Sequence, residues 1–190
     1  MDKIDLLDLS KKYSYADYLS WRFKERVELI KGKIFKMSPP KRIHQEVSME
    51  LATSINLFLK GKKCKVYAAP FDVRLSIGQS NDEIDTVVQP DICIVCDLDK
   101  LDEHGCNGAP DLIVEILSSA TMKKDLQDKF DLYEKNGVKE YWIVHVDEKI
   151  VEVFYLDKGK YQLSRMFTHQ DQLNSVCFKG LKIDLIDVFE

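Results

Sequence analysis

The sequence contains VVQPDICIV at residues 87–95 and PDLIVEIL at residues 110–117, two short apolar runs that carry carboxylates. Apolar side chains occupy both alternating faces of each run, which predicts two strands that are buried on both sides. An ionised carboxylate in such a strand is unfavourable unless a cation or several hydrogen bonds compensate for it. We therefore expect Asp91 and Glu115 either to be ion-paired or to bind one metal ion together.

The spacing of strands decides which acids can meet. Asp111 and Glu115 lie four residues apart on one predicted strand, so their Cα atoms are roughly 13 Å apart, too far to share one ion. Asp91 and Glu115 belong to consecutive strands, which are usually neighbours in a sheet. Neighbouring strands lie about 4.8 Å apart, so these two carboxylates converge if the register is suitable. Two hard oxygen ligands suit Mg²⁺ or Mn²⁺.

A cation for this pair is available on the helix that the sequence predicts over residues 121–136. Asp125, Lys129 and Tyr133 fall on one row of that helix, beside its apolar stripe. Two interpretations of the row remain open at this point. Asp125 and Lys129 form an ordinary surface ion pair worth about 0.3 kcal/mol, or Lys129 reaches the carboxylates.

Periodicity along the chain predicts one α/β domain over residues 1–190, with a mixed central sheet flanked by helices. We expect segment 97–109 to be a polar loop. The predicted elements are a helix at 14–21, a hairpin at 28–37, an amphipathic helix at 41–60, strands at 64–76, 84–96 and 111–117, a helix at 121–136, a strand at 140–146, and edge strands at 150–156 and 160–166.

Composition restricts the possible function classes. The net charge is −4, which argues against non-specific attachment to nucleic acid over the whole surface. Two basic stretches, Lys31 to Arg42 and Lys60 to Lys65, are most simply solvated surface, with phosphate contact as the alternative. We expect no signal peptide and no membrane span. Five cysteines in such a chain predict reduced thiols in the cytoplasm.

Zinc binding by Cys93 and Cys96, with His104 and Cys106 downstream, is an alternative, but the spacing of Cys93 and Cys96 is against it. Residues i and i+3 of a strand point to opposite faces, so the two thiols cannot converge on one ion. We expect them to act as small buried hydrophobic groups.

Six stretches resemble, in order, the Uma-two family of restriction-endonuclease-like proteins in the PD-(D/E)xK nuclease superfamily. The likeness runs from about residue 15 to the C-terminus. The stretches are ELIKG at 28–32, MSPP at 37–40 with His44-Gln45, APFDVRL at 69–75, VQPD at 88–91, GAPDLIVEILS at 108–118 and EYWIV at 140–144.

The resemblance implies a restriction-endonuclease-like core of one helix, three strands, a helix and a strand, preceded by a hairpin and followed by edge strands. It implies that Asp91 and Glu115 are the metal ligands. It also implies that Lys129 replaces the lysine that the motif places two residues after the glutamate, where this chain has Leu117. His44 and Glu28 match further positions of the family site; on the residues alone, His44 is an ordinary helix-start histidine and Glu28 an ordinary hydrogen-bonding acid.

The function predicted on these grounds is a Mg²⁺-dependent (or Mn²⁺-dependent) endonuclease that binds the phosphate backbone of DNA and hydrolyses its phosphodiester bonds. The absence of lysine at position 117 leaves a second interpretation, a DNA-binding or assembly protein that keeps the nuclease fold without cleaving. Hydrolysis of RNA is a third. By analogy with nucleases that cut both strands, we expect a homodimer, with residues 150–166 as a contact.

Overall fold

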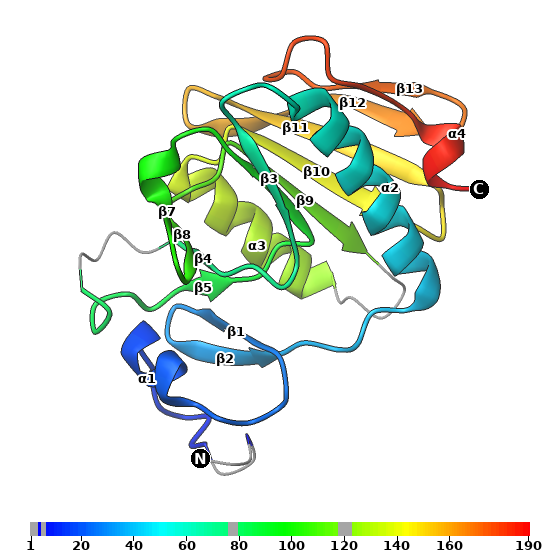
Figure 1. Cartoon of the computed structure of the whole chain (residues 1–190). Helices are drawn as coiled ribbons and strands as arrows, with labels where there is room; N and C mark the ends of the chain where they lie inside the picture. Colours follow the sequence, from blue (N-terminus) through cyan, green and yellow to red (C-terminus); the bar gives the residue numbers. More distant parts are fainter. Residues whose placement is uncertain (1–3, 5–6, 76–79, 118–122) are drawn as a thin grey trace.

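A six-stranded mixed sheet forms the centre of the molecule (Figure 1). The structure is a computed structural model that describes residue 4 and residues 7–75, 80–117 and 123–190, with the backbone alone for 123–125. The strand order is β12-β11-β10-β9-β6-β3, and only β9 and β10 are parallel neighbours. The strands are β3 (Lys65–Ala68), β6 (Ile92–Val95), β9 (Leu112–Leu117), β10 (Glu140–His145), β11 (Ile150–Asp157) and β12 (Lys160–Thr168).

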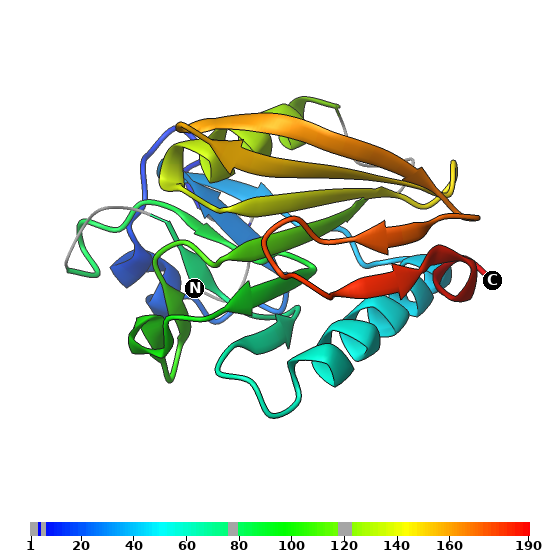
Figure 2. The same cartoon turned by 90° about the horizontal axis from the view of Figure 1, so that it is seen from above.

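Two long helices cover opposite faces of this sheet (Figure 2). Helix α2 (Arg42–Leu59) buries Val47, Leu51, Ile55 and Leu59, which recur every four residues and pack on one face. Helix α3 (Lys123–Asn136) packs on the other face and ends before Gly137, whose φ of 81° allows the left-handed stop. The order α2, β3, β6, β9, α3, β10 is the predicted nuclease-like core.

A second sheet lies beside α3, with strand order β2-β1-β5-β4-β8-β7. Its first hairpin joins β1 (Val27–Ile30) to β2 (Lys33–Lys36) through Lys31 and Gly32, whose φ angles of 53° and 79° suit a two-residue hairpin turn. This confirms the predicted hairpin. The other strands are β4 (Val73–Arg74), β5 (Val87–Val88), β7 (Leu101–Asp102) and β8 (Gly105–Asn107).

Two of the predicted strands were wrong as single elements. Segment 64–76 divides into β3 and β4, and segment 84–96 divides into β5 and β6, with each half in a different sheet. Pro70 and Pro90 lie at the two breaks and have no N–H to donate to a strand partner. The divided segments connect the two sheets.

The predicted polar loop 97–109 was also wrong, because it contains a short helix, Leu98–Lys100, and the hairpin β7–β8. Gly105 has φ of 129°, and a Cβ there would lie 2.2 Å from the carbonyl oxygen of Asp72. Only glycine permits this close approach, which places the hairpin beside β4.

The last twenty residues add elements that the sequence did not predict. Strands β13 (Gln172–Asn174) and β14 (Lys182–Asp184) pair with each other, and α4 (Leu185–Val188) packs on the α2 side of the central sheet. The strands predicted at 150–156 and 160–166 are confirmed as β11 and β12, but only β12 is an edge strand, because β11 pairs with β10 on its other side.

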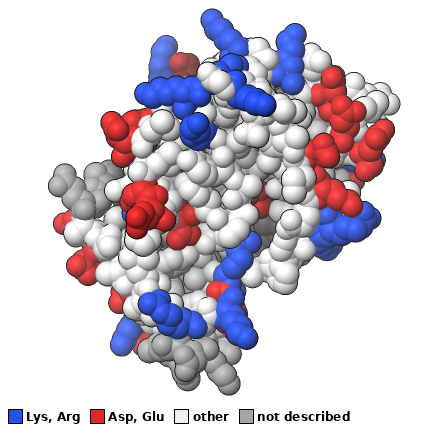
Figure 3. Space-filling view, viewed as in Figure 1, with Lys and Arg blue, Asp and Glu red and all other residues white. Residues whose placement is uncertain are grey.

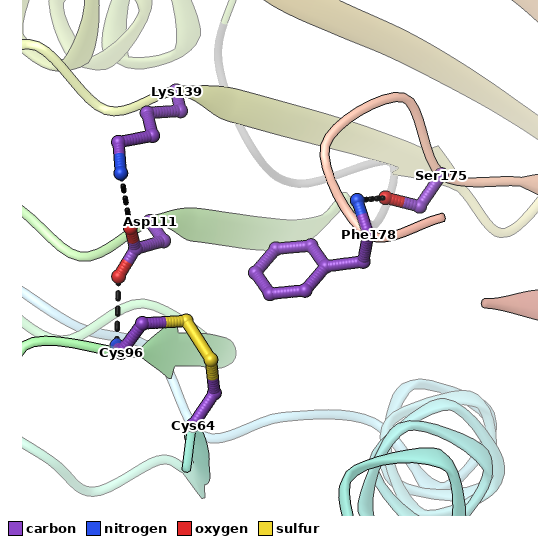
Figure 4. The surroundings of a disulfide bond; sticks show 6 residues. All are labelled: Cys64, Cys96, Asp111, Lys139, Ser175 and Phe178. Carbon is purple, nitrogen blue, oxygen red and sulfur yellow. Dashed lines mark hydrogen bonds and ion pairs between the residues drawn. A yellow bond between two sulfur atoms is a disulfide. The ribbon is translucent and has the colours of Figure 1, made fainter. Parts of the chain in front are cut away.

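The expectation that all cysteines are reduced thiols was wrong for two of them. Cys64 and Cys96 form a disulfide (Figure 4). The antiparallel β3–β6 register pairs Lys65 with Val95. Cys64, which precedes Lys65, therefore lies opposite Cys96, which follows Val95. Cys93 and Cys106 are buried thiols, as expected, and burial raises the pKa of Cys106 to about 11. None of the described helices is long and apolar enough to cross a bilayer.

Candidate active site

The five predicted site residues line one pocket of about 280 Å³. Glu28 comes from β1, His44 from the start of α2, Asp91 from the residue before β6, Glu115 from β9 and Lys129 from α3. The pocket therefore lies where the second sheet, both long helices and two central strands meet.

Strand register brings Asp91 and Glu115 together. Strands β6 and β9 are antiparallel with Ile92 opposite Val114, so the next positions outward are Asp91 and Glu115. The backbone N–H of Ile116 donates to Oδ2 of Asp91 at 2.7 Å, which fixes that carboxylate at the edge of β9. The two acids lie in one pocket, on the same side of the sheet.

Lys129 points into the pocket and joins two of the acids. Its Nζ lies 2.8 Å from Oε1 of Glu28 and 3.0 Å from Oε1 of Glu115, and only 13% of its side chain is exposed. Lys129 is therefore no surface residue; the side chain of Asp125 lies outside the described residues. Burial lowers the pKa of Lys129, but the charges of Glu115 and Glu28 outweigh burial and raise it. The lysine keeps its proton.

Tyr133, which the sequence analysis placed on the Lys129 row without a role, is a further residue of the site. It lies one helical turn beyond Lys129, fully buried, and its hydroxyl donates to Oε1 of Glu115 at 2.6 Å. Burial raises the pKa of Glu115, and the charges of Asp91 and Glu28 add to this, while Lys129 and the Tyr133 hydroxyl oppose it. The position of Tyr133 on the Lys129 row was the available signal.

Glu28 is held by a second residue that the sequence reasoning missed. The backbone N–H of Gln89 donates to Oε1 of Glu28 at 2.8 Å. The side-chain amide of Gln89 donates to Oδ1 of Asp72 at 2.7 Å. The guanidinium of Arg26 donates to Oε1 of Gln89 at 2.8 Å. These contacts fix Gln89 beside the pocket, so Glu28 has a defined orientation toward Lys129.

His44 lies against Asp91 at the start of α2. Its Nε2 is 3.3 Å from Oδ1 of Asp91, and its Nδ1 is buried without a hydrogen-bond partner among the described residues. Burial lowers the pKa of His44, but the Asp91 contact and the charge of Glu115 outweigh it and raise the pKa overall.

Asp111 belongs to a different part of the molecule. One of its carboxylate oxygens accepts from the N–H of Cys96 at 2.7 Å, and the other contacts Nζ of Lys139 at 2.7 Å (Figure 4). It holds the end of β6 against the start of β10. Asp111 is therefore apart from Glu115, as expected from their separation of four residues along one strand.

The pocket's donor set fits a magnesium-like ion. Within the described ranges, no three His, Cys, Asp or Glu side chains are arranged as a complete metal site. Mg²⁺, however, is usually held by one or two carboxylates and keeps several waters. Among the described residues, the hydrogen bonds of Glu115 are made by Oε1, so Oε2 is available to such an ion beside Asp91.

Basic side chains are divided between two places. Arg26 and Lys36 line the pocket with Lys129. The stretch Lys60–Lys65 follows the opposite end of α2, and an 18-residue helix is about 27 Å long. Figure 3 shows a group of Lys and Arg side chains over that end of α2. The second basic stretch is therefore remote from the pocket.

Comparisons with known proteins show what this chain is similar to. The family model described as "Uma2: Putative restriction endonuclease" matches residues 15–186. The uncharacterized protein slr1290 of Synechocystis sp. is 26% identical over 147 residues, which cover 76% of this chain and 74% of the relative. A crystal structure described as "a putative nuclease belonging to DUF820" from Anabaena variabilis superposes with a TM-score of 0.74 at 20% identity, covering 93% of this chain and 97% of that one. At that identity the structural likeness shows the fold alone.

Proposed function

Because the chain belongs to the Uma2 family, whose model matches residues 15–186, we propose that it is a metal-dependent endonuclease that hydrolyses phosphodiester bonds in DNA. The observation that supports this most is the buried ammonium group of Lys129 between Glu28 and Glu115, in the pocket that also holds Asp91. A buried cation beside a convergent pair of carboxylates suits a substrate that carries a phosphate.

Asp91 and Glu115 are proposed to hold Mg²⁺ or Mn²⁺. When bound, such an ion polarises a phosphoryl oxygen and lowers the pKa of its water. The remaining work is done by side chains of this chain. Tyr133 and Ile116 N–H hold the two carboxylates in place, and His44 contacts Asp91 from α2.

Lys129 is proposed to stabilise the charge that develops at phosphorus and to orient the attacking water. In the reaction, the water oxygen bonds to phosphorus and the bond from phosphorus to the leaving sugar oxygen breaks. The attacking water loses its proton to the solvent, and the leaving oxygen takes up a proton from the solvent. Glu28 keeps the ammonium group directed into the pocket through its 2.8 Å contact.

The proposal is tested by the nicking of supercoiled plasmid in Mg²⁺ or Mn²⁺. We expect Lys129→Met to lower the rate by at least about 100-fold, as the loss of one transition-state donor does elsewhere. Glu115→Gln, which removes a proposed metal ligand, should lower the rate at least as much. Lys135→Met, an exposed residue of the same helix, and Glu148→Gln, an exposed residue of a turn, are matched controls. Equal nicking by the wild type and Glu115→Gln would disprove the assignment.

Titration calorimetry with Mn²⁺ separates the enzyme from a fold that binds DNA without cleaving it. We expect one site that Asp91→Asn removes. A wild type that neither binds Mn²⁺ nor nicks DNA would favour the non-cleaving alternative. We expect an RNA of the same sequence to resist cleavage.

We also propose that two copies associate through β12, the edge strand of the central sheet. Leu163 and Met166 on this strand are about half exposed, at 51% and 48%. Unpaired edge strands are natural sites for pairing with another chain. Sedimentation velocity of the wild type and of Leu163→Lys tests this, because a lysine on the edge should leave monomers.

A further inference from the structure

The pocket has an apolar part that hydrolysis of a phosphodiester does not need. Phe35, Met37, Leu117 and Leu126 line it, each only partly buried. Partly exposed apolar side chains around a concave site mark the place where an apolar portion of a ligand binds. A phosphate and a metal ion would contact none of them favourably.

Phe35 is placed directly beside the proposed catalytic groups. In the β1–β2 register it lies opposite Glu28, so the two side chains are on the same face of the hairpin and their Cβ atoms are about 5 Å apart. Glu28 in turn contacts Lys129. Within the described residues the Phe35 ring forms no ring pair, although most aromatic side chains of this chain do.

The size and charge of the pocket favour one nucleotide over a continuous duplex. A cavity of about 280 Å³ is at the lower end of small-molecule sites. The basic stretch at Lys60–Lys65 lies too far away to extend a cationic track from it. In a duplex the flat faces of the bases are stacked inside and cannot reach an aromatic ring, whereas an unpaired base can stack on one.

We propose that this pocket takes an unpaired nucleotide of single-stranded DNA, with its base stacked on Phe35 and its phosphate beside Lys129. Arg26 and Lys36 on the pocket lining balance the charge of the adjoining backbone. The inference rests on the proposed function for the identity of the reacting group, but the preference for unpaired DNA can be measured as binding, without cleavage.

The experiment compares the binding of labelled oligonucleotides by fluorescence anisotropy in Ca²⁺, for a single strand and for the blunt duplex of the same sequence. We expect the single strand to bind at least about tenfold more tightly. Phe35→Leu keeps an apolar side chain without a ring and should weaken single-strand binding about tenfold, because base stacking on an aromatic residue is typically of that size. Phe35→Tyr restores the ring and should recover most of the affinity.

Leu57→Ala, which removes an exposed side chain at the far end of α2, is the matched control. Equal binding of duplex and single strand, or equal affinity of Phe35→Leu and the wild type, would overturn the inference. The same oligonucleotides are then tested for cleavage in Mn²⁺. Binding that depends on the Phe35 ring, without cleavage, would uphold the inference and refute the proposed function. Cleavage of the duplex at the rate of the single strand would support the proposed function and refute the preference for unpaired DNA.

Discussion

At the scale of single residues, Tyr133 shows how one hydroxyl group can define a site. It donates to Glu115 from a fully buried position, and its ring packs edge-on against Tyr141 at 5.1 Å. Tyr133→Phe keeps the ring and removes the donor. We expect the free energy of unfolding to fall by only about 1 kcal/mol, while Mn²⁺ affinity and nicking fall about tenfold because Glu115 is less well oriented.

Calorimetry, nicking and urea unfolding of Tyr133→Phe check this prediction. Tyr155→Phe removes a hydroxyl group from β11, outside the pocket, and is the control. Unchanged Mn²⁺ affinity in Tyr133→Phe would mean that the hydroxyl does not position the ligand.

The ion pair of Arg74 with Asp102 makes stability depend on pH. Nη2 of Arg74 lies 2.7 Å from Asp102, and the arginine side chain is buried whereas the aspartate is about half exposed. Burial raises the pKa of Asp102, but Arg74 and the N–H of His104 outweigh it, so the pKa lies below its usual 3.8. The stabilisation is therefore complete above about pH 4 and is lost as the pH falls through the lowered pKa.

Asp102→Asn should lower the free energy of unfolding by about 1–2 kcal/mol at pH 7, and the difference from the wild type should shrink toward pH 2. Urea unfolding at several pH values measures it. Asp99→Asn, at an exposed neighbouring position, is the control. A difference that stays constant with pH would show that the carboxylate charge is not responsible.

How far single site residues could be predicted depended on their geometry. Asp91 and Glu115 followed from the spacing of strands, because acids in buried runs on neighbouring strands can converge. Lys129 was ambiguous, since a helical row alone does not tell which way it faces. Gln89 supports Glu28 through its backbone N–H, and a backbone contact across 61 residues has no local sequence signal.

At the scale of elements, the long periodic segments were predictable and the short ones were not. Helix α2 and strands β9 and β10 have strong apolar patterns and pack on the core that the patterns imply. The division of segments 64–76 and 84–96 between two sheets is decided by pairing with strands that are distant in the sequence. Two-residue strands such as β4 form because partner strands are already there, and no local pattern specifies them.

One buried carboxylate joins the loop between the two C-terminal strands to the central sheet, in addition to the apolar packing of those strands. Glu140 on β10 is completely buried and accepts from Nε1 of Trp142 at 2.7 Å and from the backbone N–H of Cys177 at 2.7 Å. The Ser175 hydroxyl and the Val176 N–H also donate to it. With four donors and no ion pair to any described residue, this acid stabilises the fold by hydrogen bonds.

Glu140→Ala should lower the free energy of unfolding by about 3 kcal/mol, because it leaves buried donors without an acceptor. We expect hydrogen exchange at Val176 and Cys177 to accelerate more than exchange in α3. Glu148→Ala, in the exposed turn before β11, should change neither the free energy of unfolding nor the hydrogen exchange at these two positions. Uniform acceleration across the protein would show a global effect in place of a local attachment.

At the scale of the whole molecule, a net charge of −4 implies that nucleic acid binds through a small cationic area and not over the whole surface. The pocket lining contains three cations, Arg26, Lys36 and Lys129, beside the carboxylates of Glu28, Asp91, Glu115 and Asp128. Three cations near the backbone can neutralise three phosphates. Each neutralised phosphate of a single strand contributes about −0.7 to the slope of log K against log salt concentration.

We therefore expect a slope of about −2 for a single-stranded oligonucleotide, measured by anisotropy between low and moderate salt. Lys36→Gln should reduce the magnitude of the slope by about 0.7. The triple variant Lys60→Gln, Lys63→Gln and Lys65→Gln should leave the slope unchanged, because those lysines lie beyond the far end of α2. Lys62 is retained in this variant because its ammonium group packs over the Phe58 ring. A flatter slope in the triple variant would place DNA along α2 and contradict a binding area confined to the pocket.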